Sequence, residues 1–116
     1  MTAPARARLP NRRYREAFDC TPEGHTYRAE IGRDITYEPG QGYIGSGAIR
    51  ELFLSTAKTG AHLDAAARDS GLLFSLCLQY GCPIETILAS LTKDHEGRPA
   101  GALGRAIEIA IGKTSK

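Results

Sequence analysis

Residues 25–32 read HTYRAEIG, and this stretch decides what kind of sheet the chain builds. Apolar and charged side chains alternate along it, which is the period of a strand with one buried face, in the order Tyr27, Arg28, Ala29, Glu30, Ile31. The turn sequence TPEG at residues 21–24 precedes it, and residues 14–20 also have strand character. We therefore expect the two runs to pair as an antiparallel hairpin.

The sequence after this hairpin predicts one more strand and then helices. Residues 48–55 carry apolar side chains on both faces, which predicts a strand of which one part is central and covered on two sides. Helical spacing follows in three segments, residues 63–80, 83–91 and 102–111. Because strands precede helices without alternating, we predict an α+β fold, with a small antiparallel sheet of about three strands and two or three helices packed on one face.

The 116 residues are 41% hydrophobic and 24% charged, which is typical of one globular domain. We expect a flexible basic arm at residues 1–13, one domain at residues 14–112 and a polar tail at residues 113–116. The net charge is +2, yet the first fifteen residues contain no acid and five arginines, Arg6, Arg8, Arg12, Arg13 and Arg15. Such a block suggests a tail that binds an acidic partner or phosphates, and a solvated, partly disordered end is the favoured interpretation.

A glycine-rich segment at residues 40–47 matches the pattern G-x-G-x-x-G, with glycines at Gly40, Gly42, Gly45 and Gly47. In dinucleotide-binding folds this pattern holds a pyrophosphate at a helix N-terminus. Here the residues that follow predict a strand, so the pattern is a weak indication of a phosphate loop. A flexible loop is the favoured interpretation.

The cysteines and histidines do not predict a catalytic or metal site. Cys20, Cys77 and Cys82 lack CxxC spacing, so we expect reduced thiols, a cytoplasmic location and no metal or cofactor. We expect Cys77 in the core. Cys82 is the candidate reactive thiol, because it lies at a predicted helix start. The three histidines, His25, His62 and His95, are isolated in sequence and are expected at the surface. The apolar stretches are too short for a membrane span.

Several segments together resemble the TSCPD domain, which occurs in cobalamin-dependent ribonucleotide reductases and in small stand-alone proteins. The resemblance covers residues 9–111 and rests on LPNRR at 9–13, RELFL at 50–54, KTG at 58–60 and LFSLCLQYGCP at 73–83, with Glu85 and Ile87. The Thr-Ser-Cys-Pro-Asp sequence that names the domain corresponds here to PAGAL at residues 99–103, which lacks the cysteine and the aspartate. Any role of that cysteine is therefore not carried over.

The resemblance implies a link to deoxynucleotide synthesis without the reaction itself, which needs a larger substrate barrel and a cobalamin site. Our first hypothesis is a non-catalytic binding or accessory module with a protein partner, for which a nucleotide or nucleic acid is also possible. The second is a subunit or regulator of a ribonucleotide reductase, and the third is a small enzyme with an unrecognised thiol or histidine site. A homodimer is also possible.

Overall fold

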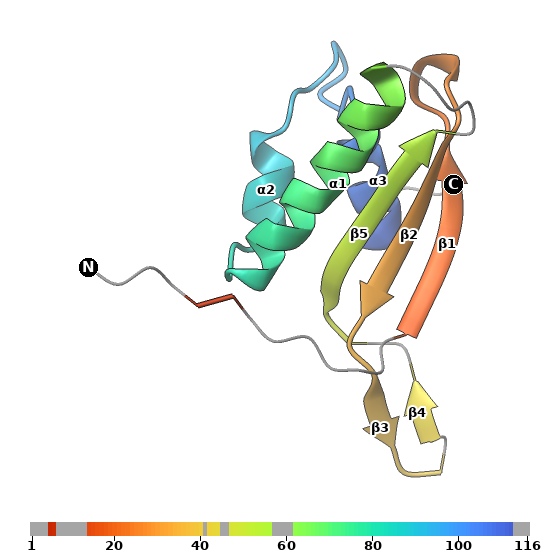
Figure 1. The fold of residues 1–116 in the computed structure, drawn as a ribbon, viewed down its shortest axis with the longest axis vertical. Helices are drawn as coiled ribbons and strands as arrows, with labels where there is room; N and C mark the ends of the chain where they lie inside the picture. The colour runs from red at the N-terminus through yellow and green to blue at the C-terminus, as the bar shows by residue number, and fades with distance from the viewer. Residues whose placement is uncertain (1–4, 7–13, 41, 45–46, 57–61, 113–116) are drawn as a thin grey trace.

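The structure of the chain, a computed structural model, describes residues 5–6, 14–40, 42–44, 47–56 and 62–112. A three-stranded antiparallel sheet is covered on one face by three helices, and a two-stranded ribbon extends from one end of the sheet (Figure 1). The predicted α+β class is confirmed. The predicted tail at residues 113–116 and most of the arm lie outside the described residues.

The main sheet consists of β1 (Tyr14–Cys20), β2 (Tyr27–Arg33) and β5 (Ile49–Thr56), in the order β1-β2-β5. β1 and β2 form the predicted hairpin, joined by a short 3-10 helix at Pro22–Gly24. Among the described strands β5 pairs with β2 alone, so it is an edge strand and the prediction of a central strand is wrong. Strand order depends on non-local pairing, which the apolar residues of β5 do not encode.

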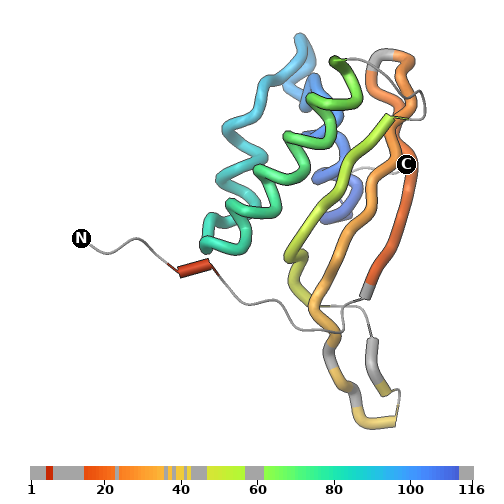
Figure 2. Tube along the Cα trace, viewed as in Figure 1, coloured from red at the N-terminus to blue at the C-terminus, as the bar shows by residue number. Residues whose placement is uncertain are grey.

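The glycine-rich segment belongs to a second hairpin that the sequence did not predict. β3 (Thr36–Glu38) pairs antiparallel with β4 (Gly42–Ile44). Figures 1 and 2 show this ribbon pointing away from the main sheet and the helices. Gly40 lies in its turn at a φ of +87°, a conformation that a residue with a Cβ adopts only with strain.

The helices are α1 (His62–Gln79), α2 (Ile84–Ser90) and α3 (Ala102–Ala110). Their bounds agree with the predicted segments to within a few residues. The core lies between helices and sheet, and it contains mainly Phe18, Tyr27, Ala29, Ile31, Leu52, Leu54, Phe74, Leu88, Ala106 and Ile107. Alternate residues of β2 contribute to it, as the period of residues 27–31 predicts. None of the described helices combines the length and hydrophobicity that crossing a membrane requires.

α1 lies alongside β5, and its buried positions are Ala67, Gly71, Phe74, Ser75 and Gln79 (Figure 2). Cys77 is exposed, so the prediction that it belongs to the core is wrong. The cause is how closely the helix approaches the strand. A Cβ built on Gly71 would lie only 2.9 Å from the Leu52 carbonyl oxygen. Small and polar residues therefore make this contact, and Cys77 lies on the side of the helix that faces solvent.

Candidate functional site

The free edge of β5 is closed by side chains of α1. The Ser75 hydroxyl accepts a hydrogen bond from the Leu52 backbone N–H at 2.8 Å and lies 3.0 Å from the Leu52 carbonyl oxygen. The Gln79 amide donates to the Arg50 carbonyl at 3.3 Å. The backbone polar groups of an exposed edge strand otherwise attract further strands. Because α1 occupies this edge, a partner has access to the outer side of the helix instead.

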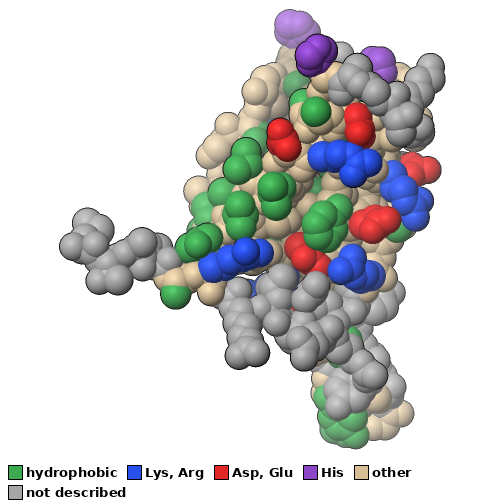
Figure 3. All heavy atoms as spheres, in the orientation of Figure 1, with side chains coloured by type: hydrophobic (Ala, Val, Ile, Leu, Met, Phe, Trp, Pro, Cys, Tyr) green, Lys and Arg blue, Asp and Glu red, His purple; other side chains and the backbone are tan. Residues whose placement is uncertain are grey.

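That outer side carries a group of large apolar side chains, which we call the α1 apolar surface: Leu72, Leu73 and Tyr80. Leu72 is 51% exposed and Leu73 is 62% exposed. Figure 3 shows hydrophobic side chains gathered over the helix, beside a charged region on the sheet. Contiguous exposed apolar patches on small proteins often mark interaction sites. The sequence does not predict this surface, because helical spacing alone does not say which apolar residues face the sheet.

The face of the sheet that the helices leave uncovered is charged, with both signs represented (Figure 3). Arg15 on β1 lies 3.6 Å from Glu51, and its guanidinium is 5.9 Å from the centre of the Phe53 ring. Arg28 pairs with Glu30 at 3.5 Å. Arg28 and Glu30 are both exposed, so their pair contributes little to stability, up to about 1 kcal/mol. The mixture of signs gives this face no uniform attraction for an acidic partner.

The predicted basic arm is represented by two arginines in the described part of the chain. Arg15 belongs to β1 and the sheet surface. The Arg6 guanidinium donates a hydrogen bond to the Gln79 side chain, close to the C-terminal end of α1. Arg8, Arg12 and Arg13 lie outside the described residues. Binding of an acidic partner by the arm stays a prediction.

The predicted phosphate loop also stays a prediction, although the structure gives its glycines local roles. Gly40 lies in the turn between β3 and β4, and Gly42 is the first residue of β4. Gly47 donates its backbone N–H to the Asp34 carbonyl at 3.1 Å, and a Cβ there would lie 2.2 Å from that oxygen. Gly45 lies outside the described residues.

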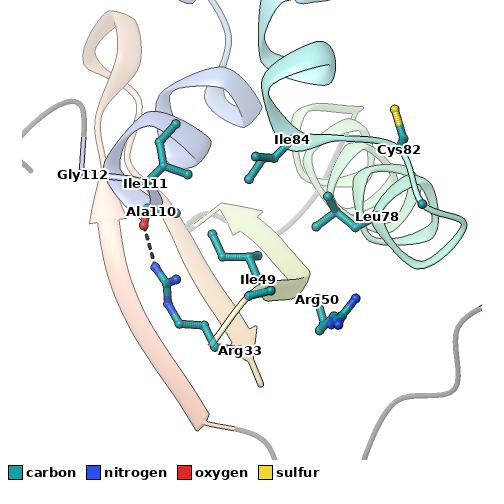
Figure 4. A pocket seen from close by; sticks show the side chains of 11 residues that line it. Arg33, Ile49, Arg50, Leu78, Cys82, Ile84, Ala110, Ile111 and Gly112 are labelled. Atoms are coloured by element: carbon teal, nitrogen blue, oxygen red, sulfur yellow. Dashed lines mark hydrogen bonds between the residues drawn. The ribbon is translucent and has the colours of Figure 1, made fainter. Parts of the chain in front are cut away.

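A pocket of about 760 Å³ opens between the start of β5 and the C-terminal ends of α1 and α3. Apolar side chains surround one space in Figure 4, contributed by Ile49, Leu78, Ile84 and Ile111. Arg33 and Arg50 lie on either side of Ile49. The sequence does not predict this pocket, because its residues come from the ends of five separate elements and form no local motif.

The two pocket arginines are held differently. Arg33 donates Nε to the Glu16 carboxylate at 2.9 Å and Nη2 to the Ala110 carbonyl at 2.6 Å, so it ties β2 to the end of α3. Arg50 donates Nε to the Asp34 carboxylate at 2.8 Å, and its side chain remains 37% exposed. Arg50 is therefore the more accessible guanidinium.

The three thiols occupy three different environments. Cys82 is partly exposed at the rim of the pocket, and its sulfur points away from Leu78 and Ile84 (Figure 4). Cys20 is buried under the helices, and burial raises the pKa of its thiol, as does the nearby Asp19 carboxylate. Reactivity of Cys82 stays a prediction, and the Sγ atom lies 3.9 Å from the Pro83 carbonyl.

The three histidines are exposed, as predicted, and gather at one end of the molecule (Figure 3). Over the described ranges, no group of three or more histidine, cysteine or acidic side chains is arranged to hold a metal ion.

Comparison with known proteins gives one informative relative. A vitamin B12-dependent ribonucleotide reductase from Agrobacterium fabrum (strain C58 / ATCC 33970) is 34% identical to the chain over 87 residues. The chain is related to this reductase. The matched region is 75% of this chain but 6% of the reductase, so the chain spans a small fraction of its relative. No family model and no solved structure matches the chain, and membership of the TSCPD domain stays a prediction.

Proposed function

We propose that the chain is a non-catalytic accessory module that binds a vitamin B12-dependent ribonucleotide reductase through the α1 apolar surface. The observation that carries the proposal is this surface on a chain related to such a reductase. The reductase segment similar to this chain is a small part of its length. The remainder of a reductase is therefore available to cover a surface of this kind.

The energetics favour a partner that covers the helix. Burying a leucine side chain completely contributes about 1.5–3 kcal/mol, and Leu72 and Leu73 each keep half or more of their exposure to water. Few groups need to lose their solvation, because the hydrogen-bonding side chains of α1 that meet the sheet are already satisfied by β5. A flat apolar partner surface would gain contact without breaking these bonds.

The test is a binding measurement between the purified chain and the intact Agrobacterium reductase. We expect a complex whose dissociation constant rises at least about tenfold in the double variant Leu72→Ser/Leu73→Ser. The matched control is Tyr37→Ser, which removes an exposed aromatic side chain from the β3–β4 ribbon instead. Absence of a complex, or equal binding by the double variant, would contradict the proposal.

A second copy of the chain is the competing occupant of the same surface. Light scattering of the chain alone distinguishes the two. If the chain forms a dimer that the double variant abolishes, the surface serves self-association and the reductase contact proposed for it is wrong.

A further inference from the structure

We infer that the pocket between β5 and the ends of α1 and α3 binds a small organic anion that carries an apolar body. This inference goes beyond the proposed contact with a reductase and does not depend on it. It rests on the composition of the pocket wall, the accessibility of Arg50 and the size of the space.

The wall separates into an apolar part and a cationic part. Ile49, Leu78, Ile84 and Ile111 give a surface for a hydrocarbon or aromatic body (Figure 4). Both ionised side chains in the wall are arginines, and within the described residues no acidic side chain lines the pocket. The carboxylates that pair with these arginines, Glu16 and Asp34, do not line the pocket.

Arg50 is the anchor that such an anion would reach. Its bond to Asp34 uses Nε, and a guanidinium offers five N–H donors, so the terminal nitrogens extend beyond this contact. It lines the pocket and its side chain is 37% exposed, so a ligand from solvent can reach it. Arg33, by contrast, is committed to Glu16 and to the end of α3. It fixes the shape of the site and contributes positive charge.

The size of the pocket excludes very small ions as its best occupants. A space of about 760 Å³ falls within the range of about 300–1,000 Å³ that is usual for organic ligands. Inorganic phosphate would reach the arginine but leave the four aliphatic side chains in water. A nucleoside phosphate and a medium-chain carboxylate both satisfy the two parts of the wall, and the experiment distinguishes them.

The probe is 8-anilinonaphthalene-1-sulfonate, an organic anion with an aromatic body, titrated into the isotopically labelled chain and followed by NMR. We expect saturable shifts at the amides of two glycines in the pocket wall, Gly81 and Gly112. The amides of Gly24 and Gly97, in turns outside the wall, should not move. Shifts confined to the α1 apolar surface would overturn the inference.

Three variants test the role of the guanidinium. Arg50→Gln should raise the dissociation constant about tenfold, because it removes a charge-assisted contact. Asp34→Asn breaks the same ion pair but keeps Arg50, so it should bind the probe as well as the wild type or better. Arg28→Gln, on the other face of the sheet, should have no effect. If Arg50→Gln binds normally, or if Asp34→Asn weakens binding equally, the inference is wrong.

Competition against the bound probe then identifies the type of anion. Displacement by dATP but not by dodecanoate indicates a nucleoside phosphate, and the reverse indicates a carboxylate. Failure of both to displace the probe at millimolar concentration, with inorganic phosphate equally inactive, would overturn the assignment to either class. These measurements use the chain alone, so their outcome is independent of whether a reductase binds.

Discussion

The side of α1 that lies along β5 and the side that faces solvent differ in composition. Toward the strand the helix presents Gly71, Ser75 and Gln79, which allow close approach and bond the strand backbone. Toward solvent it presents Leu72 and Leu73. An ordinary amphipathic helix turns its large apolar residues inward. Here only part of the helix follows this rule, because its contact with the strand edge is made by small and polar residues, and the two leucines remain exposed.

The largest expected effect tests whether residues on the two sides of α1 contribute differently to the free energy of unfolding. Phe74→Ala should lower the free energy of unfolding by about 3–5 kcal/mol, because the ring is buried in the core. The neighbouring change Leu73→Ala should alter it by less than about 0.5 kcal/mol, because this side chain is mostly exposed. Urea unfolding measures both. A loss above about 2 kcal/mol in Leu73→Ala would mean that Leu73 is buried in solution, by dimerisation or otherwise.

The second prediction concerns the close approach at Gly71. Gly71→Val should destabilise the protein by about 3 kcal/mol, because the added atoms collide with the Leu52 carbonyl and the Leu54 backbone. Gly71→Ala should cost less, since a gain of about 1 kcal/mol in helix propensity offsets the contact. The control Ala66→Val, on the exposed side, should cost about 0.5 kcal/mol. Thermal unfolding in which both valine variants behave alike would contradict the packing at Gly71.

Part of this arrangement could be predicted from the sequence. The alternation from Tyr27 to Ile31 is local, so it predicted the β1–β2 hairpin and the buried face of β2. Gly81 and Pro83 likewise marked the boundary between α1 and α2, and Gly81 has a φ of +96°. Predictions of this kind agree with the structure because each depends on only a few adjacent residues.

The rest depends on contacts between distant segments, which a single sequence does not reveal. The edge position of β5 follows from which strands pair, and the apolar pattern of residues 48–55 fits a central strand as well. The burial of Ser75 and Gln79 follows from the strand edge beside them. Arg33 and Arg50 join one pocket only because β2 and β5 are neighbours and α3 ends beside them.

The third prediction isolates the hydrogen bond that closes the strand edge. Ser75→Ala leaves the Leu52 N–H without its acceptor at a buried position, so it should cost about 2 kcal/mol. Hydrogen exchange at the Leu52 amide should accelerate by the matching factor of about 30. The control is Ser70→Ala, whose hydroxyl bonds the Ala67 carbonyl of its own helix and should cost about 0.5 kcal/mol or less. Unchanged protection of Leu52 in Ser75→Ala would show that α1 does not close the edge in this way.

The smallest expected effect is the pH dependence of stability that Asp64 contributes where α1 meets the end of β5. Asp64 accepts hydrogen bonds from the Thr56 backbone N–H at 3.0 Å and from Arg68 at 2.9 Å. The Thr56 N–H, and after it Arg68, hold the pKa of Asp64 below its usual range. The folded state therefore favours the ionised carboxylate. Its contribution is complete above the usual pKa of an aspartate, about 4, and is lost as the pH falls through the lowered value.

Asp64→Asn should consequently reduce the stability lost by the protein on acidification from pH 6 to about pH 2.5, measured by urea unfolding at each pH. Some dependence should remain, because backbone N–H groups also lower the pKa of Asp94. Arg68→Gln keeps the Thr56 N–H, the larger cause, so it should retain more of the dependence than Asp64→Asn does. If the two variants lose equal amounts of the pH dependence of stability, the ion pair with Arg68, and not the hydrogen bond from Thr56, is the main cause of the lowered pKa of Asp64. The contact between helix and strand would then end at Leu54 instead of continuing to Thr56.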